Sequence, residues 1–167
     1  MKINKLVFFG LAMWLFNACH IYNFTGTGKI DAKTFQVNNF QNNAALIEPG
    51  VDRQFTIALQ ELIQNQTPLS ITTTNGDLLY EGEIVEYRIS PMTATANQTA
   101  AQNRLYVSVN VRFSNKNDEE SDFEKRFSHF YDYPASEQLI GARLTEALNV
   151  IFEQITQDIF NESLAKW

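Results

Sequence analysis

Few side chains in this chain of 167 residues have the chemistry for catalysis or metal binding. It contains one cysteine, Cys19, and two histidines, His20 and His129. Zinc sites are normally built from cysteine and histidine ligands at regular spacings, so a site here would need mostly carboxylates. We therefore expect no metal site.

The remaining candidates for catalysis lie on predicted strands. Ser128 and His129 are adjacent, and neighbouring residues of a strand point to opposite faces, so they cannot act together as nucleophile and base. Three glutamates, Glu81, Glu83 and Glu86, have the carboxyl groups for acid–base catalysis. Their charge-bearing strand is more typical of a solvated sheet face. We expect no catalytic residue and no enzymatic activity.

A glycine-containing segment, Thr25-Gly26-Thr27-Gly28-Lys29, superficially resembles a phosphate-binding loop. That motif needs glycine where Asn23 stands and serine or threonine where Ile30 stands, with a helix after it rather than the strand predicted here. The segment is better interpreted as a flexible tether. No cofactor is expected.

The first 18 residues have the features of a secretory signal peptide. Lys2 and Lys5 form a positive start, and the uncharged run of about 11 residues from Leu6 to Phe16 is far shorter than the roughly 20 residues needed to span a bilayer. We therefore predict a signal peptide over 1–18.

The end of this leader resembles the lipobox of bacterial lipoproteins. Leu15-Phe16-Asn17-Ala18 runs directly into Cys19, although Asn17 is more polar than the small residue usual at its position. The resemblance implies acylation of Cys19 and a lipidated tether over 19–29, since several acyl chains hold a protein stably to a membrane. The alternatives are a buried, unmodified Cys19 after a cut elsewhere, and an N-terminal membrane-spanning helix.

Composition predicts one folded, acidic domain over 30–167. A hydrophobic content of 44% with 13 phenylalanines is incompatible with a disordered chain. The formal charge is −6, and removing the leader with Lys2 and Lys5 takes it to −8. This charge argues against nucleic acid as a partner, because nucleic-acid binding relies on neutralising phosphates.

The first half of the domain is expected to contain a strand, a helix and a hairpin. Alternation around Phe35 and Val37 predicts a strand within 30–42, and apolar residues at helical spacing after Pro49 predict an amphipathic helix of about four turns from Val51. The turn signal Asn75-Gly76-Asp77 predicts that 69–73 and 78–89 form a hairpin. The apolar pattern changes faces near Gly82, which indicates a bulge or a bend.

The second half is expected to contain a long loop, a second hairpin and a long helix. The polar composition of 90–103 predicts the loop. Faultless alternation over 105–113 predicts a half-buried strand, and a second alternating strand follows over 123–131. A helix of about 25 residues is predicted after Ser136, its N-cap. The fold class is therefore α+β, with two amphipathic helices on one face of a mixed sheet of four to five strands.

A series of short matches behind the lipobox resembles the LptE family of outer-membrane lipoproteins, in particular its Bacteroidetes-like branch. The matches, in chain order, are Tyr22-Asn23-Phe24-Thr25-Gly26, Phe35-Gln36-Val37, Asn42-Asn43-Ala44, Glu48-Pro49, Phe55-Thr56 with Leu59, Gly82-Glu83-Ile84-Val85-Glu86-Tyr87, Ser90-Pro91, Asn103-Arg104-Leu105, Asp158-Ile159-Phe160-Asn161 and Trp167. They cover nearly the whole mature chain.

The resemblance implies a subunit without catalysis that plugs the β-barrel of its partner LptD, helps that barrel assemble, and assists delivery of lipopolysaccharide to the outer leaflet. It also implies a lipid anchor in the outer membrane that faces the periplasm. The alternative is a periplasm-facing lipoprotein that binds a soluble partner or a small ligand, unrelated to lipopolysaccharide export. Fold alone does not separate the two.

Two groups of residues are candidates for these contacts. A plug needs a polar outer face, which Tyr106, Ser108, Asn110 and Arg112 provide on the predicted central strand, although an ordinary solvated face explains them equally well. Lipopolysaccharide carries phosphates, for which the candidates are Arg104, beside the long loop, with Arg88 and Lys125.

Overall fold

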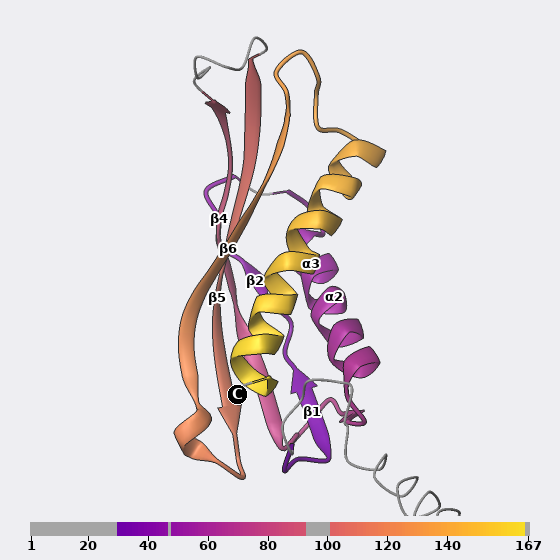
Figure 1. Cartoon of the computed structure of the whole chain (residues 1–167), viewed down its shortest axis with the longest axis vertical. Coiled ribbons are helices and arrows are strands. Elements are labelled where there is room, and N and C mark those ends of the chain that lie inside the picture. The colour runs from indigo at the N-terminus through magenta and orange to yellow at the C-terminus, as the bar shows by residue number, and fades with distance from the viewer. Residues whose placement is uncertain (1–29, 47, 93–100, 166–167) are drawn as a thin grey trace, which may run out of the picture.

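The computed structural model describes residues 30–46, 48–92 and 101–165 (Figure 1). The predicted signal peptide, the tether and Cys19 lie outside the described residues. The elements, in chain order, are β1 (Thr34–Val37), β2 (Gln41–Asn42), α2 (Val51–Gln66), β3 (Ser70–Ile71), β4 (Leu78–Met92), β5 (Gln102–Asn115), the short 3-10 helix η2 (Glu119–Ser121), β6 (Phe123–Pro134) and α3 (Ala142–Leu164).

The strands form one mixed sheet in the order β3-β1-β4-β5-β6, with β2 paired to β4 beyond the end of β1. The three long strands, β4, β5 and β6, are antiparallel neighbours. The short strands pair in parallel, β1 with both β3 and β4, and β2 with β4. The six strands slightly exceed the predicted four to five, and the predicted α+β class is confirmed.

Both helices cover the same face of the sheet (Figure 1). The alternate residues of β5 from Leu105 to Phe113 are almost completely buried beneath them. Each helix contributes one apolar stripe, which includes Phe55 and Leu59 on α2 and Ile151 on α3. This arrangement confirms the predicted two layers, because each one-sided element buries its apolar side against the other layer.

The predicted hairpin between 69–73 and 78–89 is wrong. Strand β3 pairs with β1, which lies between β3 and β4. The turn around Asn75 instead carries the chain across the start of β1, where the Asp77 carboxylate accepts backbone N–H bonds from Lys33 (2.9 Å) and Thr34 (3.0 Å). These contacts join residues more than 40 positions apart, so a local turn signal does not reveal them.

The bulge predicted near Gly82 is present in β4, where the register shifts between Ile84 and Glu86. Two other features differ from the prediction. Strands β4 and β5 remain paired as far as Met92 and Gln102, so they extend into the predicted 90–103 loop, of which 93–100 lie outside the described residues. Helix α3 begins at Ala142, after Gly141 with φ of 56°, and Ser136 is not its N-cap.

The Asp77 contacts predict a pH dependence of stability. The two backbone N–H groups, that of Lys33 first, hold the pKa of the Asp77 carboxyl below its ordinary value of 3.8. A lowered pKa in the folded state stabilises the fold above the ordinary pKa, and this stabilisation is lost as the pH falls through the lowered value. We expect Asp77→Asn to lower the free energy of unfolding at neutral pH. The variant should also lose less of that free energy than the native protein does when the pH is lowered.

Urea unfolding of both proteins between about pH 7 and pH 2 measures this difference. Asp31→Asn removes another carboxylate from the same end of the sheet and is the matched control. If the free energy of unfolding depended on pH in the same way in the native protein and in Asp77→Asn, the stabilising role of the Asp77 carboxylate would be contradicted.

Candidate functional site: the polar face of the sheet

The face of β4, β5 and β6 opposite the helices carries most of the polar side chains of the sheet, and we call it the polar face. The bulge at Val85 shifts the alternation by one residue, so Glu86 and Arg88 share this face with Glu81 and Glu83. The cross-strand register therefore aligns five rows across β4, β5 and β6: Glu81–Arg112–Glu124, Glu83–Asn110–Arg126, Glu86–Ser108–Ser128, Arg88–Tyr106–Phe130 and Ser90–Arg104–Asp132.

The first row is a chain of charged hydrogen bonds. The Arg112 guanidinium donates to Glu81 at 2.8 Å and to Glu124 at 3.4 Å, and the Asn38 amide donates to Glu81 at 3.1 Å. The hydrogen bonds to Glu81 and Glu124 raise the pKa of Arg112. The Arg112 side chain is therefore held in place from both sides by its neighbours in the row.

Glu86 connects the middle rows. It accepts hydrogen bonds from Arg88 at 2.5 Å and Arg126 at 2.6 Å, and the bond from Arg88 is the main reason that the pKa of Glu86 is lowered. The Ser108 hydroxyl, which is fully buried, lies 2.8 Å from the Ser128 hydroxyl. Ser108 therefore supports its neighbours and has no surface of its own to offer a partner.

The last two rows, Arg88–Tyr106–Phe130 and Ser90–Arg104–Asp132, combine cations with aromatic rings. Arg104 donates two hydrogen bonds to Asp132, at 2.6 and 2.8 Å, and its guanidinium lies 3.5 Å from the centre of the Phe130 ring. The guanidinium of Arg88 lies 4.7 Å from the centre of the Tyr106 ring. The hydrogen bond from Arg104 lowers the pKa of Asp132. Two of the three predicted lipopolysaccharide-binding cations are therefore brought together here.

The third predicted cation, Lys125, lies apart from them. Its register partner is Val111, so it lies on the helix side of the sheet, where its ammonium group donates to Glu162 of α3 at 2.6 Å. Of the predicted partner-binding residues, Tyr106, Asn110 and Arg112 reach the surface of the polar face, whereas Ser108 does not. The roles assigned to these residues remain predictions.

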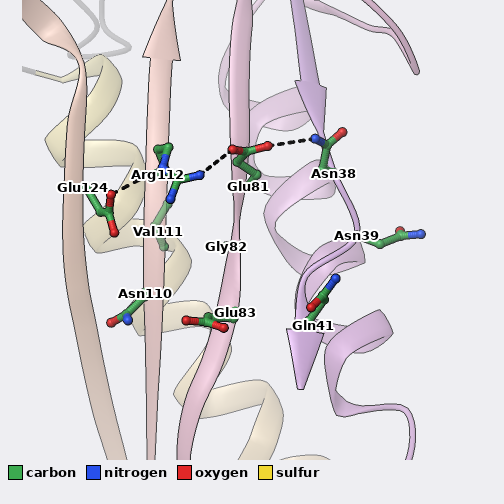
Figure 2. Close-up of a pocket in the computed structure, with 10 residues that line it drawn as sticks. All are labelled: Asn38, Asn39, Gln41, Glu81, Gly82, Glu83, Asn110, Val111, Arg112 and Glu124. Atoms are coloured by element: carbon green, nitrogen blue, oxygen red, sulfur yellow. Dashed lines mark hydrogen bonds and ion pairs between the residues drawn. The ribbon is translucent and has the colours of Figure 1, made fainter. Parts of the chain in front are cut away.

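A groove of about 400 Å³ crosses the polar face where β1 ends and β2 begins (Figure 2). It is lined by residues from four strands, β2, β4, β5 and β6, and from the segment between β1 and β2. These residues are Asn38, Asn39, Gln41, Glu81, Gly82, Glu83, Asn110, Val111, Arg112 and Glu124. We call this site the amide groove.

Three residues of the amide groove were not predicted as site residues: Asn38, Asn39 and Gln41. They were included in a single predicted strand, whereas the chain leaves the sheet after Val37 and returns at Gln41. The polar run Asn38-Asn39 inside an alternating pattern was the available signal. Its position beside β4 depends on the long-range pairing of Gln41 with Glu83.

Two further features of the described residues are relevant to the site. Within 30–46, 48–92 and 101–165, no group of three His, Cys, Asp or Glu side chains is placed to hold a metal ion. No helix in the same ranges has the length and apolar character needed to cross a membrane.

The fold and the polar face define a class of protein, a two-layer α+β domain whose second sheet face carries paired polar side chains. Residues 32–163 match the model of the LptE family, which is described as lipopolysaccharide assembly. The chain belongs to the LptE family. This is a family of lipoproteins without enzymatic activity. Comparison with the sequences of curated proteins found no match.

Solved structures share the fold at low sequence identity. A hypothetical protein from Chlamydia trachomatis has a TM-score of 0.53 and 10% identity over 81% of this chain and 99% of its own. A minor lipoprotein from Acinetobacter baumannii has a TM-score of 0.48, with 10% identity over 78% and 91% of the two chains. An uncharacterised lipoprotein from Nitrosomonas europaea has a TM-score of 0.45, with 14% identity over 77% and 79%. The first of these likenesses supports the fold alone.

Proposed function

We propose that this protein is an outer-membrane lipoprotein that plugs and helps assemble an LptD-like β-barrel and assists delivery of lipopolysaccharide to the outer leaflet. Membership of the LptE family supports the link to lipopolysaccharide assembly. The observation that carries the plug role is the polar face, because a surface inside a water-filled barrel must remain polar while the helices cover the apolar side.

The arrangement of charges supports a contact surface for a protein. Arg112 and Glu86 are each held by two partners, so their side chains are already ordered before a partner arrives. Ordering side chains in advance lowers the entropic cost of association. Tyr106 supplies an aromatic side chain of the kind enriched in protein interfaces.

A test of the plug role changes the exposed positions of the polar face. We expect the triple variant Tyr106→Lys, Asn110→Lys, Arg112→Glu to recover the barrel at least about tenfold less efficiently from detergent-solubilised outer membranes, because mismatched charges at an interface cost several kcal/mol. The domain should stay folded, since these side chains lie on the surface of the sheet.

The matched control places three changes on α2, on the other side of the molecule: Arg53→Glu, Gln64→Lys and Asn65→Lys. This control should recover the barrel like the native protein. Equal recovery by the polar-face variant would remove the polar face from the interface.

We also propose that Arg88 and Arg104 contact the phosphates of lipopolysaccharide. Their guanidinium groups lie near one end of the polar face, beside the Tyr106 and Phe130 rings. Arginine binds phosphate with two parallel hydrogen bonds, the geometry that Arg104 already uses toward Asp132. A phosphate would bind the N–H groups of Arg104 that Asp132 does not occupy. Lys125, which is paired with Glu162 on the other face, would bind a phosphate separately.

Anchoring through Cys19 is the second part of the proposal and has its own test. Intact mass spectrometry of protein purified from membranes should show a chain that begins at Cys19 and carries acyl groups. The variant Cys19→Ala should lose almost all of its membrane association, because the acyl chains supply most of the free energy of attachment. A native chain with an unmodified Cys19 would contradict the anchor.

A further inference from the structure

The amide groove has unused hydrogen-bonding groups. The side-chain amides of Asn39, Gln41 and Asn110 make no hydrogen bond to any other described residue. Each amide offers one acceptor and two donor hydrogens, and a sugar hydroxyl is both a donor and an acceptor. The three amides therefore suit a ligand that carries several hydroxyl groups.

The charge of the amide groove disfavours an anion. Its lining contains three carboxylates, Glu81, Glu83 and Glu124, against one guanidinium, Arg112. That guanidinium is already bound to two of the carboxylates. A phosphate would face uncompensated negative charge, and an apolar ligand would leave buried polar groups unpaired. A neutral polar ligand meets neither cost.

Gly82 and Val111, which are register partners, contribute to the floor of the groove. A Cβ atom at Gly82 would point toward the Phe40 ring on the helix side of the sheet. The volume of about 400 Å³ falls within the range of small-molecule sites, roughly 300–1,000 Å³. Figure 2 shows the bonded row from Asn38 through Glu81 and Arg112 to Glu124 along one side, with Gln41, Glu83 and Asn110 along the other. The bonded row holds one wall in place before any ligand binds.

We propose that the amide groove binds a neutral oligosaccharide built of hexose units, with the amides of Asn39, Gln41 and Asn110 recognising its hydroxyl groups. Glu83 lies between Gln41 and Asn110. One of its carboxylate oxygens accepts a hydrogen bond from the Asn43 amide, and the other is an acceptor for a further hydroxyl. This inference goes beyond the proposed function, because it requires neither a barrel nor a phosphate. The sugar is either the glycan part of lipopolysaccharide or a free oligosaccharide.

The test titrates the full chain, in detergent micelles, with maltotriose, mannotriose and galactotriose, and follows binding by saturation-transfer NMR and calorimetry. At least one trisaccharide should bind. The triple variant Asn39→Ala, Gln41→Ala, Asn110→Ala should weaken that binding by about tenfold or more, since each lost hydrogen bond lowers affinity severalfold. The single variant Gln41→Ala, at an exposed position, should weaken it by about fivefold.

The control removes three helix amides instead, in Gln60→Ala, Gln64→Ala, Gln154→Ala, and should bind like the native protein. No binding of any trisaccharide up to about 10 mM would overturn the proposal. Undiminished binding by the groove variant, with an unchanged unfolding temperature, would also overturn it.

A second arm identifies the source of the sugar by comparing lipopolysaccharide that carries its polysaccharide with lipid A alone. Tighter binding of the glycan-bearing form, lost in the groove variant, supports the proposal with lipopolysaccharide as the source. Equal binding of the two forms, with trisaccharide binding intact, supports it with a free oligosaccharide. These measurements use the isolated protein, so a negative result would contradict sugar binding without contradicting the plug role. A negative result in the barrel-recovery experiment would likewise contradict the plug role without contradicting sugar binding.

Discussion

The substitution Gly82→Ala is expected to destabilise the domain by about 3 kcal/mol, although alanine in place of glycine within a strand is normally favourable. A Cβ atom at this position would lie 2.0 Å from the backbone oxygen of Asn110 and 2.9 Å from the Phe40 ring. The first of these atoms belongs to the neighbouring strand and cannot rotate away. Strand β4 would have to separate from β5 at the centre of the sheet.

Urea unfolding measures this loss, and amide hydrogen exchange locates it. Exchange should accelerate at Glu81–Ile84 of β4 and at the paired residues of β5. Asn39→Ala changes an exposed side chain of the same groove and should alter stability by no more than about 0.5 kcal/mol. A stabilised Gly82→Ala variant would show that the strands tolerate a Cβ atom here.

The substitution Phe55→Ala is expected to cost about 4 kcal/mol. The Phe55 side chain is completely buried, and its ring meets those of Phe40, at 4.9 Å, and Phe152, at 5.2 Å, in edge-to-face contacts. These three residues belong to the segment between β1 and β2, to α2 and to α3. The change therefore leaves a cavity where both helices meet the sheet.

Small domains are stable by about 5–15 kcal/mol, so Phe55→Ala should unfold at a clearly lower urea concentration and accumulate less in cells. Ile57→Ala, two residues along the same helix at a position 39% exposed, is the matched control. It should retain most of the native stability. A small loss for Phe55→Ala would mean that the core closes around the missing ring.

These two variants distinguish loss of fold from loss of contact. Gly82→Ala and Phe55→Ala act on the sheet and the core, whereas the polar-face variant changes solvent-facing side chains only. If all three lose the barrel, stability data separate the causes. Loss of the barrel by the polar-face variant alone, at native stability, would identify that face as the interface.

The local elements of this protein were predictable from its sequence. Strict alternation over 105–113 and the apolar stripes of the two helices are local patterns, and each identifies one side of an element for burial. The two-layer fold and the polar face of β5 follow from them. The resemblance to the LptE family came from short matching segments in the same order along the chain. The match of residues 32–163 to the family model confirms it.

Only the tertiary structure determined which strands and side chains are neighbours. It inserted β1 between β3 and β4, buried Ser108 and placed Asn39 and Gln41 beside Asn110. Each result depends on strand pairings between residues tens of positions apart, such as Gln41 with Glu83. Side-chain periodicity specifies which face of a strand is buried but carries no information about its neighbour, because that choice is settled by packing and long-range hydrogen bonds in the complete fold.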